Sequence, residues 1–569
     1  MTRASIYWHT LRHLKLIQFY GRFWFRVYRP KPDLHPAPGL IESPGGWSLP
    51  SQRRACMLGS ATFQFLNEAH TLDDVGWEGR GLEKLWLYNL HYFDDLNARD
   101  GHLRRDWHVA LLKSWVADNP PAVGNGWEPY PTSLRIVNWV KWHLAGNALP
   151  DVCVQSLATQ VRWLSRRLER HLLGNHLFAN AKALVFAGLL FQGSEAAAFV
   201  EKGLSIINRQ LPEQVLPDGG NFERSTMYHS IFLEDVLDLI NIAQAHSDRI
   251  DAEVVKGWRE TGGRMLHWMM GMLHPDGQIG LFNDAAFDVA PEPAELIAYA
   301  KRLGIEHGSP HNVPPPDDER ARDAHHPDVI TSEARQSMLS LLQFPESGYV
   351  RLEQDNAVAL LDVAPVGPDY LPGHAHADTL SFELSLFGQR IVVNGGTSRY
   401  GLGPERHRER QTVSHSTVEI AGQSSSEVWG GFRVARRAYP FDLEIARHVE
   451  SLSVACSHDG YTRLPGKPIH RREWLMDSEG LMVTDRVVGG QHPAVARYIL
   501  HPDVEASRAA ENEWSLVLPR GASVRIMVFT GRAKLECANY APEFGKVLPT
   551  QCLAVDLADG LACTQFIWH

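Results

Sequence analysis

Apolar residues over about the first 300 positions recur with the period of an α-helix. Between 157 and 173, leucine and valine return every three to four positions and arginines fill most of the other faces, which predicts an amphipathic helix. Gly174 ends this run, and similar runs begin at Asn175 and at Phe232. Several helices of this kind, joined by short Gly, Pro and Asn turns, favour a stacked or toroidal all-α domain.

The pattern changes in the second half of the chain. From about 305 to 335 the sequence is rich in proline and charged residues, which is typical of a linker or surface loop. After this stretch the hydrophobic period is two, and hairpins are predicted at 381–393, 473–488 and 514–529. Strands that follow one another at such short intervals indicate an antiparallel β-sandwich.

These patterns divide the chain into three parts. We expect a basic and aromatic N-terminal segment at 1–50, an (α/α) toroid that forms an incomplete barrel at 51–320, and an antiparallel β-sandwich at 335–569. The expected fold class is therefore multidomain α and β. A groove between an all-α domain and an all-β domain is the natural place for a ligand.

The N-terminal segment contains LIQFYGRFWFRVYRP, in which aromatic residues are interspersed with arginines. Charged residues interrupt every apolar run that could serve as a secretory signal, and no stretch approaches about 20 apolar residues. We therefore expect no transmembrane segment and a cytoplasmic protein, with a periplasmic or membrane-peripheral location as the alternatives. For the segment itself, packing on its own protein is favoured over contact with an anionic membrane surface.

Composition narrows the function. The net charge is −10, from 56 Lys and Arg against 66 Asp and Glu, which gives no support to a nucleic-acid-binding protein. An acidic substrate stays compatible with this balance, because one basic cleft can lie on an acidic surface. The 28 His and 17 Trp supply proton-transfer groups and flat faces for sugar rings, so a carbohydrate enzyme is a candidate.

The densest cluster of chemistry-bearing residues is PGHAHAD at 372–378, directly before the first hairpin. If this segment is extended, His374 and His376 point to the same face, where two imidazoles suit metal binding or a ligand beside a proton-transfer group. Asn394 follows the hairpin, and His415 heads another strand from which it could complete a site with His376. The structural alternative is a hydrogen-bonded strand entry, with a glycine turn at Asn394.

The helical half carries a second group of candidates. Asn175 and His176 stand at a helix start, where Asn is also a good N-cap. Tyr228 lies in a polar helix opening after a glycine turn. Aromatic faces beside a guanidinium suit an acidic sugar, although Trp139 fits the core equally well. The residues expected to bind substrate are Trp127, Tyr130, Arg135, Trp139, Glu223, Arg224 and His229.

Four motifs, in this order along the chain, resemble the heparinase II/III family of polysaccharide lyases. They are Asn175-His176, the DGGNFERSTMYH run that ends at His229, the HAHAD run that begins at His374, and the TSRY and SHSTV stretches that contain Tyr400 and His415. The resemblance covers the chain from about Leu87 to the C-terminus. It implies an (α/α) toroid joined to an antiparallel β-sandwich.

The resemblance also implies a reaction. A lyase of this family removes H5 of a uronic acid and expels the 4-O leaving group by β-elimination, for which the adjacent carboxylate must be neutralised. By resemblance, Asn175 with His176 holds that carboxylate, Tyr228 serves as base and acid, and His374 is the alternative base. Tyr400 matches a position that assists in some relatives. An ordinary Tyr has a pKa of about 10, so a base role requires a nearby Arg or metal.

Relatives often hold a structural metal with two His and one Asp. By position, the corresponding residues here are His376, Asn394 and His415. Asn394 stands where the resemblance expects Asp, and a neutral amide is a poorer ligand than a carboxylate. One divalent metal, Zn or Ca, is therefore one hypothesis, and a water or hydrogen-bond network is the other.

The leading hypothesis is a polysaccharide lyase that acts on a uronic-acid-containing glycan. Since no export signal is visible, that glycan is expected to belong to bacterial exopolysaccharide, capsule or O-antigen metabolism. One alternative is a weak or inactive relative that binds or modifies polysaccharide during envelope biosynthesis. The other is an inverting glycoside hydrolase that uses Asp218, Glu223 or Asp284 as acid and base, with carboxyls about 6.5–9.5 Å apart.

Overall fold

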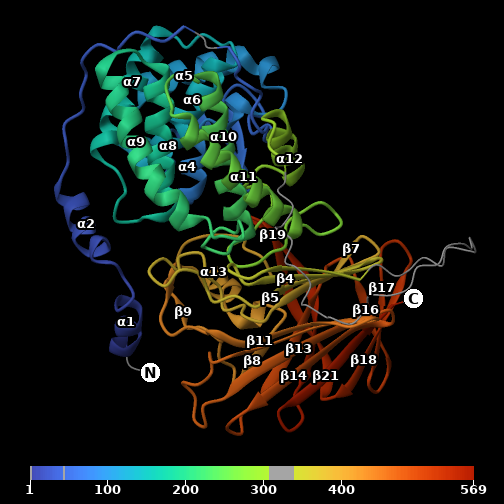
Figure 1. Cartoon of the computed structure of the whole chain (residues 1–569). Coiled ribbons are helices and arrows are strands. Elements are labelled where there is room, and N and C mark those ends of the chain that lie inside the picture. The colour runs from blue at the N-terminus through green and yellow to red at the C-terminus, as the bar shows by residue number, and fades with distance from the viewer. Residues whose placement is uncertain (1–2, 43–44, 307–338, 569) are drawn as a thin grey trace, which may run out of the picture.

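The computed structural model describes residues 3–42, 45–306 and 339–568. The linker expected at 305–335 and the boundaries expected at 320 and 335 fall almost entirely outside these residues, and the boundary expected at 51 stays a prediction. Within the described residues, helices fill the first half and strands the second (Figure 1). The predicted order of an all-α domain before an all-β domain is confirmed.

The helical domain is a stack of antiparallel helices preceded by a small hairpin, β1 (Thr62–Phe65) and β2 (Glu68–Thr71). Its helices are α3 (Leu72–Val75), α4 (Lys84–Tyr92), α5 (Arg105–Asp118), α6 (Pro129–Leu144), α7 (Asp151–Arg166), α8 (Gly174–Leu190), α9 (Gly193–Gln214), α10 (Thr226–Ala245), α11 (Ala252–Gly271) and α12 (Pro293–Arg302). None of the described helices is both long and apolar enough to cross a bilayer.

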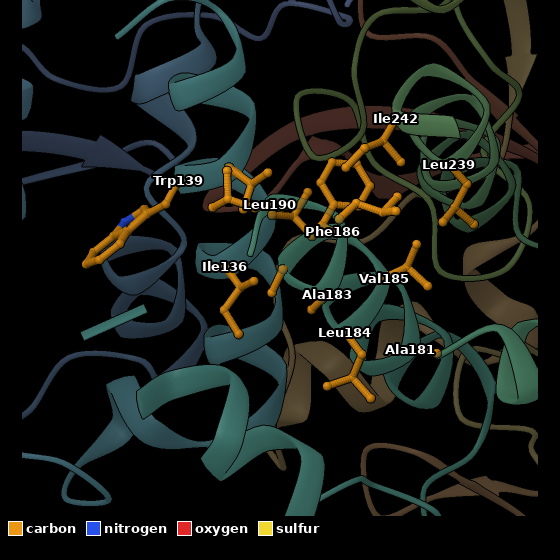
Figure 2. Packing of buried hydrophobic residues seen from close by; sticks show 14 of the residues in the cluster. Ile136, Trp139, Ala181, Ala183, Leu184, Val185, Phe186, Leu190, Leu239 and Ile242 are labelled. Atoms are coloured by element: carbon orange, nitrogen blue, oxygen red, sulfur yellow. The ribbon is translucent and has the colours of Figure 1, made fainter. Parts of the chain in front are cut away.

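The helix predicted at 157–173 ends earlier than its apolar pattern suggests. It is α7, which stops at Arg166, so that the last leucines of the pattern lie in the turn before α8. The run from Phe232 lies within α10, as predicted. Large apolar side chains of α6, α8 and α10, among them Ile136, Phe186 and Ile242, interdigitate in the core of this domain (Figure 2).

The second half is two packed antiparallel sheets. One has the strand order β11-β12-β13-β14-β21-β18-β17-β16, and the other runs β19-β20-β15-β7-β6-β5-β4-β3 with β8 paired to β15. The strands of the first sheet are β11 (Pro440–Arg447), β12 (Ser451–His458), β13 (Ile469–Asp477), β14 (Gly480–Val488), β16 (Glu505–Ala510), β17 (Glu513–Val517), β18 (Ser523–Thr530) and β21 (Leu561–Ile567). Those of the second are β3 (Leu339–Phe344), β4 (Tyr349–Gln354), β5 (Ala357–Asp362), β6 (Phe382–Leu386), β7 (Gln389–Val393), β8 (Val418–Ile420), β15 (Ala494–Leu500), β19 (Arg532–Glu543) and β20 (Lys546–Asp556).

All three predicted hairpins are confirmed, as β6–β7, β13–β14 and β17–β18. Alternate side chains of both sheets meet in one apolar core that includes Phe382, Trp474 and Phe566, as expected for a sandwich. The second half also contains the helix α13 (Pro404–Glu409), the short 3-10 helix η4 (Thr412–Ser414) and the small pair β9 (Val428–Trp429) and β10 (Arg433–Val434).

Two apolar clusters join the domains. In one, Met227 and Leu281 of the helical half pack with Val393, Ile499 and Phe544 of the sandwich. In the other, Trp268, Met272 and Phe282 pack with strands β3 to β5. Burial of these apolar side chains at the junction holds the two domains against each other. The junction between them is therefore a place where side chains from both halves can meet.

Candidate active site

The histidine motif lies in the loop before β6, so the extended conformation that would place both rings on one face is not present. Its two rings still converge, because both contact one carboxylate from the helical half. His374 Nδ1 lies 2.9 Å from Asp284 Oδ2, and His376 Nε2 lies 2.7 Å from Asp284 Oδ1. Asp284, and not strand alternation, therefore brings the two imidazoles together.

Asp284 is fully buried and stays ionised. Burial alone would raise its pKa, but the charge of Arg406 on α13 and the hydrogen bonds from His374 and His376 hold the pKa well below the usual range. Arg406 contacts both carboxylate oxygens, with Nη2 2.7 Å from Oδ2. An ionised Asp284 accepts a hydrogen bond from His374 Nδ1–H, so a neutral His374 carries its lone pair on Nε2.

Local hydrogen bonds fix this geometry across the domain junction. Ser225 is the N-cap of α10: its Oγ accepts from the backbone N–H of Tyr228 and donates to the backbone carbonyl of Asp284 at 2.5 Å. The side chain of Asn283 accepts from the backbone N–H of His376 at 2.9 Å. The start of α10 and the histidine loop are thus tied to the same two residues.

Tyr228 stands against the exposed side of this cluster. Its ring stacks on that of His374 with centroids 3.8 Å apart, and its hydroxyl lies 2.8 Å from that of Tyr400. Burial, followed by the neighbouring Tyr400, raises the pKa of Tyr228 well above its usual value. The Arg406 guanidinium lies 5.0 Å from the Tyr400 ring, yet the pKa of Tyr400 is also raised, chiefly by burial. Both phenols are therefore protonated at neutral pH.

Asn175 and His176 lie at the start of α8, on the other side of Glu223. Leu173 is the N-cap position and α8 begins at Gly174, so the N-cap alternative for Asn175 is wrong. A Cβ added at Gly174 would lie 3.3 Å from Glu223 Oε1, and Glu223 Oε2 lies 3.7 Å from His374 Nε2. These contacts bring the start of α8 to the same cluster as His374.

His176 is held in a form that suits an anion. Its Nδ1 lies 3.2 Å from Glu169 Oε2, and the ring of Tyr130 lies 4.4 Å from its own. Burial would lower the pKa of His176, but the charge and hydrogen bond of Glu169 outweigh it and raise the pKa. Tyr130 is partly exposed beside it. Among the described residues, no hydrogen bond engages the Asn175 side-chain amide, which is free for a ligand.

Several residues expected to bind substrate lie in the interior instead. The side chains of Trp127, Arg135, Trp139 and His229 are buried, with the last three at 0% exposure. Arg135 donates to Gln160, and His229 Nε2 lies 2.9 Å from the Met265 carbonyl. Their aromatic and polar groups form part of the core of the helical domain. The expectation that these four residues contact a sugar is therefore wrong. Arg224 is also turned away, with its guanidinium on the carbonyls of Glu346 and Ser347.

The three residues expected to bind metal form a chain and not a ring. His376 Nδ1 lies 3.2 Å from His415 Nε2, but the Asn394 side-chain oxygen lies 3.3 Å from the opposite nitrogen, His415 Nδ1. Two nitrogens on one tetrahedral zinc are roughly 3.3 Å apart at Zn–N distances of about 2.0 Å, so His376 and His415 fit a metal and Asn394 does not. The described residues contain no group of three or more His, Cys, Asp or Glu that could hold a metal. The metal stays a prediction.

The sequence interpretation missed the centre of the site. The sequence indicates Asp284 only as a candidate hydrolase carboxylate, and it gives no reason to select Arg406. Asp284 cannot serve as a general acid, since Arg406 keeps it ionised, and Asp218 accepts hydrogen bonds from Ser347 and Gly220 in a turn. Of the three carboxyls considered for an inverting hydrolase, only Glu223, whose pKa is raised by burial, could therefore serve as the general acid. The only sequence signal for Arg406 is the charged run PERHRER, which is typical of any exposed helix.

Comparisons with known proteins agree with this architecture. Residues 90–294 match the family model described as the heparinase II/III N-terminus, and residues 339–562 match the heparinase II/III-like C-terminal model. The chain is 24% identical to a heparin-sulfate lyase of Bacteroides stercoris over 346 residues, which are 60% of this chain and 47% of that protein. It is 23% identical to a heparin-sulfate lyase of Pedobacter heparinus over 410 residues, 68% of this chain and 57% of that one. The chain thus spans about half the length of these relatives.

Solved structures show the same fold. The crystal structure of heparinase III covers 100% of this chain and 94% of its own, with a TM-score of 0.66 at 16% identity. The heparan sulfate lyase of Pedobacter heparinus covers 97% of this chain and 88% of its own, with a TM-score of 0.56 at 17% identity. The predicted combination of a helical toroid and a β-sandwich is confirmed.

Proposed function

This chain belongs to the heparinase II/III family, and we therefore propose that it is a carbon–oxygen lyase that cleaves a uronic-acid-containing polysaccharide by β-elimination. The observation that carries the proposal is the convergence of Tyr228, His374 and Tyr400 at the domain junction around the buried Asp284. The matched relatives are heparin-sulfate lyases.

In the proposed reaction, the free amide of Asn175 and the cationic form of His176 bind the uronate carboxylate, which stabilises the enolate-like intermediate. His374 Nε2 takes the C5 proton, because Asp284 holds the ring with its lone pair on that atom. Tyr228, protonated by virtue of its raised pKa, donates to the departing 4-oxygen. The C5–H and C4–O bonds break as the C4–C5 double bond forms, so protons and electrons balance.

The charges around the site favour a glycan with few sulfates. Glu169 and Glu223 border His176, and the nearby cation Lys84 is already paired with Glu128 at 2.9 Å. Arg399 likewise pairs with Glu83. With these two cations already paired, the carboxylates that border His176 would repel a densely sulfated chain. We therefore extend the proposal to a carboxylated, sparsely sulfated glycan, such as those of bacterial exopolysaccharide, capsule or O-antigen. A cytoplasmic location stays a prediction.

Incubation with defined uronate polymers tests the function. A lyase produces ultraviolet absorbance from the conjugated C4–C5 double bond. Tyr228→Phe is expected to abolish this signal and leave substrate binding largely intact, while Tyr20→Phe, an exposed tyrosine of α2 (Leu16–Val27), serves as the matched control with full activity. New reducing ends without the absorbance would instead indicate a hydrolase. Binding without either product would indicate an inactive polysaccharide-binding protein.

His374→Ala separates the two candidate bases. If His374 takes the C5 proton, the variant loses turnover by about 10²–10⁴-fold. Tyr228 can still donate its proton to the leaving group in this variant. Turnover close to that of the unaltered protein would assign both proton transfers to Tyr228.

A further inference from the structure

Helix α2 presents its large apolar side chains to solvent. These residues recur at the spacing of a single helix face and form what we call the outer stripe: Leu16, Phe19, Tyr20, Phe23, Trp24 and Val27. Their exposed fractions range from 46% to 80%. Packing of this segment on its own protein was the favoured expectation, and for this face it is wrong. Figure 1 shows α2 beside the two domains, at the edge of the molecule.

The opposite face of α2 supplies the packing that holds it in place. Gln18 is buried and donates to the carbonyl of Tyr370 at 3.0 Å. Phe25 lies 4.5 Å from the ring of His171, and a Cβ added at Gly21 would come within 2.9 Å of the His171 side chain. Since these contacts use the inner face alone, the outer stripe contributes little to the stability of the fold.

The preceding helix α1 (Arg3–Leu11) fastens the same segment to the sandwich. The ring of Tyr7 lies 5.1 Å from that of Trp429, and the Trp429 indole N–H donates to Thr10 at 3.1 Å. With α2 held by His171 of the helical domain and Tyr370 of the sandwich half, and α1 held by Trp429 of β9, the outer stripe has a fixed orientation. The outer stripe is therefore the exposed face of a helix that tertiary contacts hold in place.

Positive charge borders the outer stripe. Arg22 and Arg26 are exposed one turn apart on α2, and Arg433 lies close enough to Arg22 to contribute to its lowered pKa, after burial. The first acidic residue in the sequence is Asp33, so this basic segment contrasts with a chain of net charge −10. Apolar side chains with aromatic members, bordered by arginines, match the chemistry of an anionic lipid headgroup layer.

We propose that α2 docks the protein on an anionic lipid bilayer, with the outer stripe at the boundary between headgroups and acyl chains. Arg22 and Arg26 would lie at the level of the lipid phosphates, and Trp24 at the interface that tryptophan prefers. Burial of several aromatic and aliphatic side chains supplies the hydrophobic part of the binding, and the arginines add electrostatic attraction to the anionic surface. This inference is independent of the lyase proposal.

Co-sedimentation of the full chain with lipid vesicles tests the inference. Binding to vesicles of phosphatidylglycerol and phosphatidylcholine is expected, with a loss on raising the salt concentration and weak binding to phosphatidylcholine alone. The double variant Phe23→Ser/Trp24→Ser and the charge reversal Arg22→Glu/Arg26→Glu are each expected to weaken binding by about tenfold or more. Val449→Ser, which removes an apolar side chain that is 97% exposed on the sandwich, is the matched control and should bind normally.

Other results would overturn the inference. One is the absence of sedimentation with anionic vesicles by a chain whose circular dichroism shows it to be folded. Another is equal binding by the α2 variants and the control. A concentration-dependent dimer that the α2 substitutions abolish, without vesicle binding, would show that a second copy covers the outer stripe. Lyase activity, measured by ultraviolet absorbance on the same variants, separates this test from that of the proposed function, since no α2 residue is among the described contacts of Tyr228.

Discussion

The same order of four residues, Arg, Asp, His and His, forms two buried chains in this protein, one at the candidate active site and one inside the sandwich. In the first, which we call the junction chain, Arg406 pairs with Asp284, Asp284 contacts His376, and His376 contacts His415. In the second, the sandwich chain, Arg472, Asp485, His470 and His458 repeat this order. The corresponding distances are 2.7 Å from His to Asp and 3.2 Å from His to His in both.

The two chains differ in how they end. In the sandwich chain, the backbone N–H of Gly460 donates to His458 Nδ1, so His458 Nε2 carries the proton for His470. Every contact then has one donor and one acceptor. In the junction chain, Nδ1 of His415 faces the side-chain oxygen of Asn394. Nε2 of His415 faces two acceptors, His376 Nδ1 and the Glu409 carbonyl. Burial lowers the pKa of His415 to about 3, so the neutral ring has one proton for acceptors on both sides.

The sandwich chain is therefore complete as a hydrogen-bond network, and the junction chain is one donor short. A buried acceptor pair without a proton between its members is unfavourable. The junction chain also has a branch that the sandwich chain lacks, because Asp284 holds His374, whose side chain is 14% exposed. The sandwich chain, in which every hydrogen bond is satisfied, therefore has a structural role. The junction chain has a partly exposed histidine, His374, that can take part in chemistry.

The largest expected effect is on the junction chain. Asp284→Asn removes the charge that orients His374 and is expected to reduce turnover by about 10³-fold, within the range for loss of general base catalysis. Because Arg406 is also fully buried and loses its counter-charge, the measurement is kcat per folded molecule on a uronate polymer, with the pH profile recorded as well. A variant with unchanged kcat would show that Asp284 does not position His374. Loss of binding alone, with kcat retained, would lead to the same conclusion.

The matching change in the sandwich chain should affect stability and not catalysis. Asp485→Asn leaves the fully buried Arg472 without its counter-charge, which is expected to cost about 3–5 kcal/mol of unfolding free energy. Urea unfolding monitored by circular dichroism measures this, and kcat per folded molecule should be unchanged. A reduced kcat would mean that the two chains are coupled and that the sandwich chain is not purely structural.

The stability that Asp485 of the sandwich chain provides should also depend on pH in the acid range. Burial would raise the pKa of Asp485, but the charge of Arg472 and the hydrogen bonds of His470 and Arg472 lower it from 3.8 to about 2. The pKa of Asp485 is lower in the folded protein than in the unfolded chain. Its ionised carboxylate therefore stabilises the fold fully above about pH 4, and this stabilisation is lost as the pH falls toward 2. The contribution is about 2 kcal/mol. Unfolding free energies of the unaltered protein and Asp485→Asn should therefore converge over this window, and curves that stay parallel would contradict the assignment.

The smallest expected effect concerns the end of the junction chain. Asn394→Asp places a carboxylate on His415 Nδ1, which makes the other ring nitrogen a better ligand, as outer-shell carboxylates do. Zinc affinity at His376 and His415 is expected to rise by about tenfold, as measured by metal analysis and titration calorimetry. His415→Ala is the control that should abolish the binding. Equal metal content in the unaltered protein and the Asn394→Asp variant would remove the metal hypothesis.

Much of the fold could be predicted because it depends on local periodicity. The hairpins at 381–393 and 473–488 follow from alternation and turn residues, and α10 follows from its helical spacing. Of the site, Tyr228, His374 and Tyr400 were identified through a resemblance and lie together. Arg135 and Trp139 were misassigned, because an aromatic or guanidinium side chain has the same pattern whether it faces a ligand or completes a core.

The linear sequence determines the order of the two domains and the pairing of adjacent strands. It also determines which residue types are available for proton transfer. Periodicity and turn chemistry act over a few residues, so they can be recognised along the chain. The folded arrangement was needed to establish that Asp284 joins His374 to His376 and that the outer stripe of α2 faces solvent. Both depend on contacts between residues tens to hundreds of positions apart, where burial and the charge of a neighbour fix what a side chain can do.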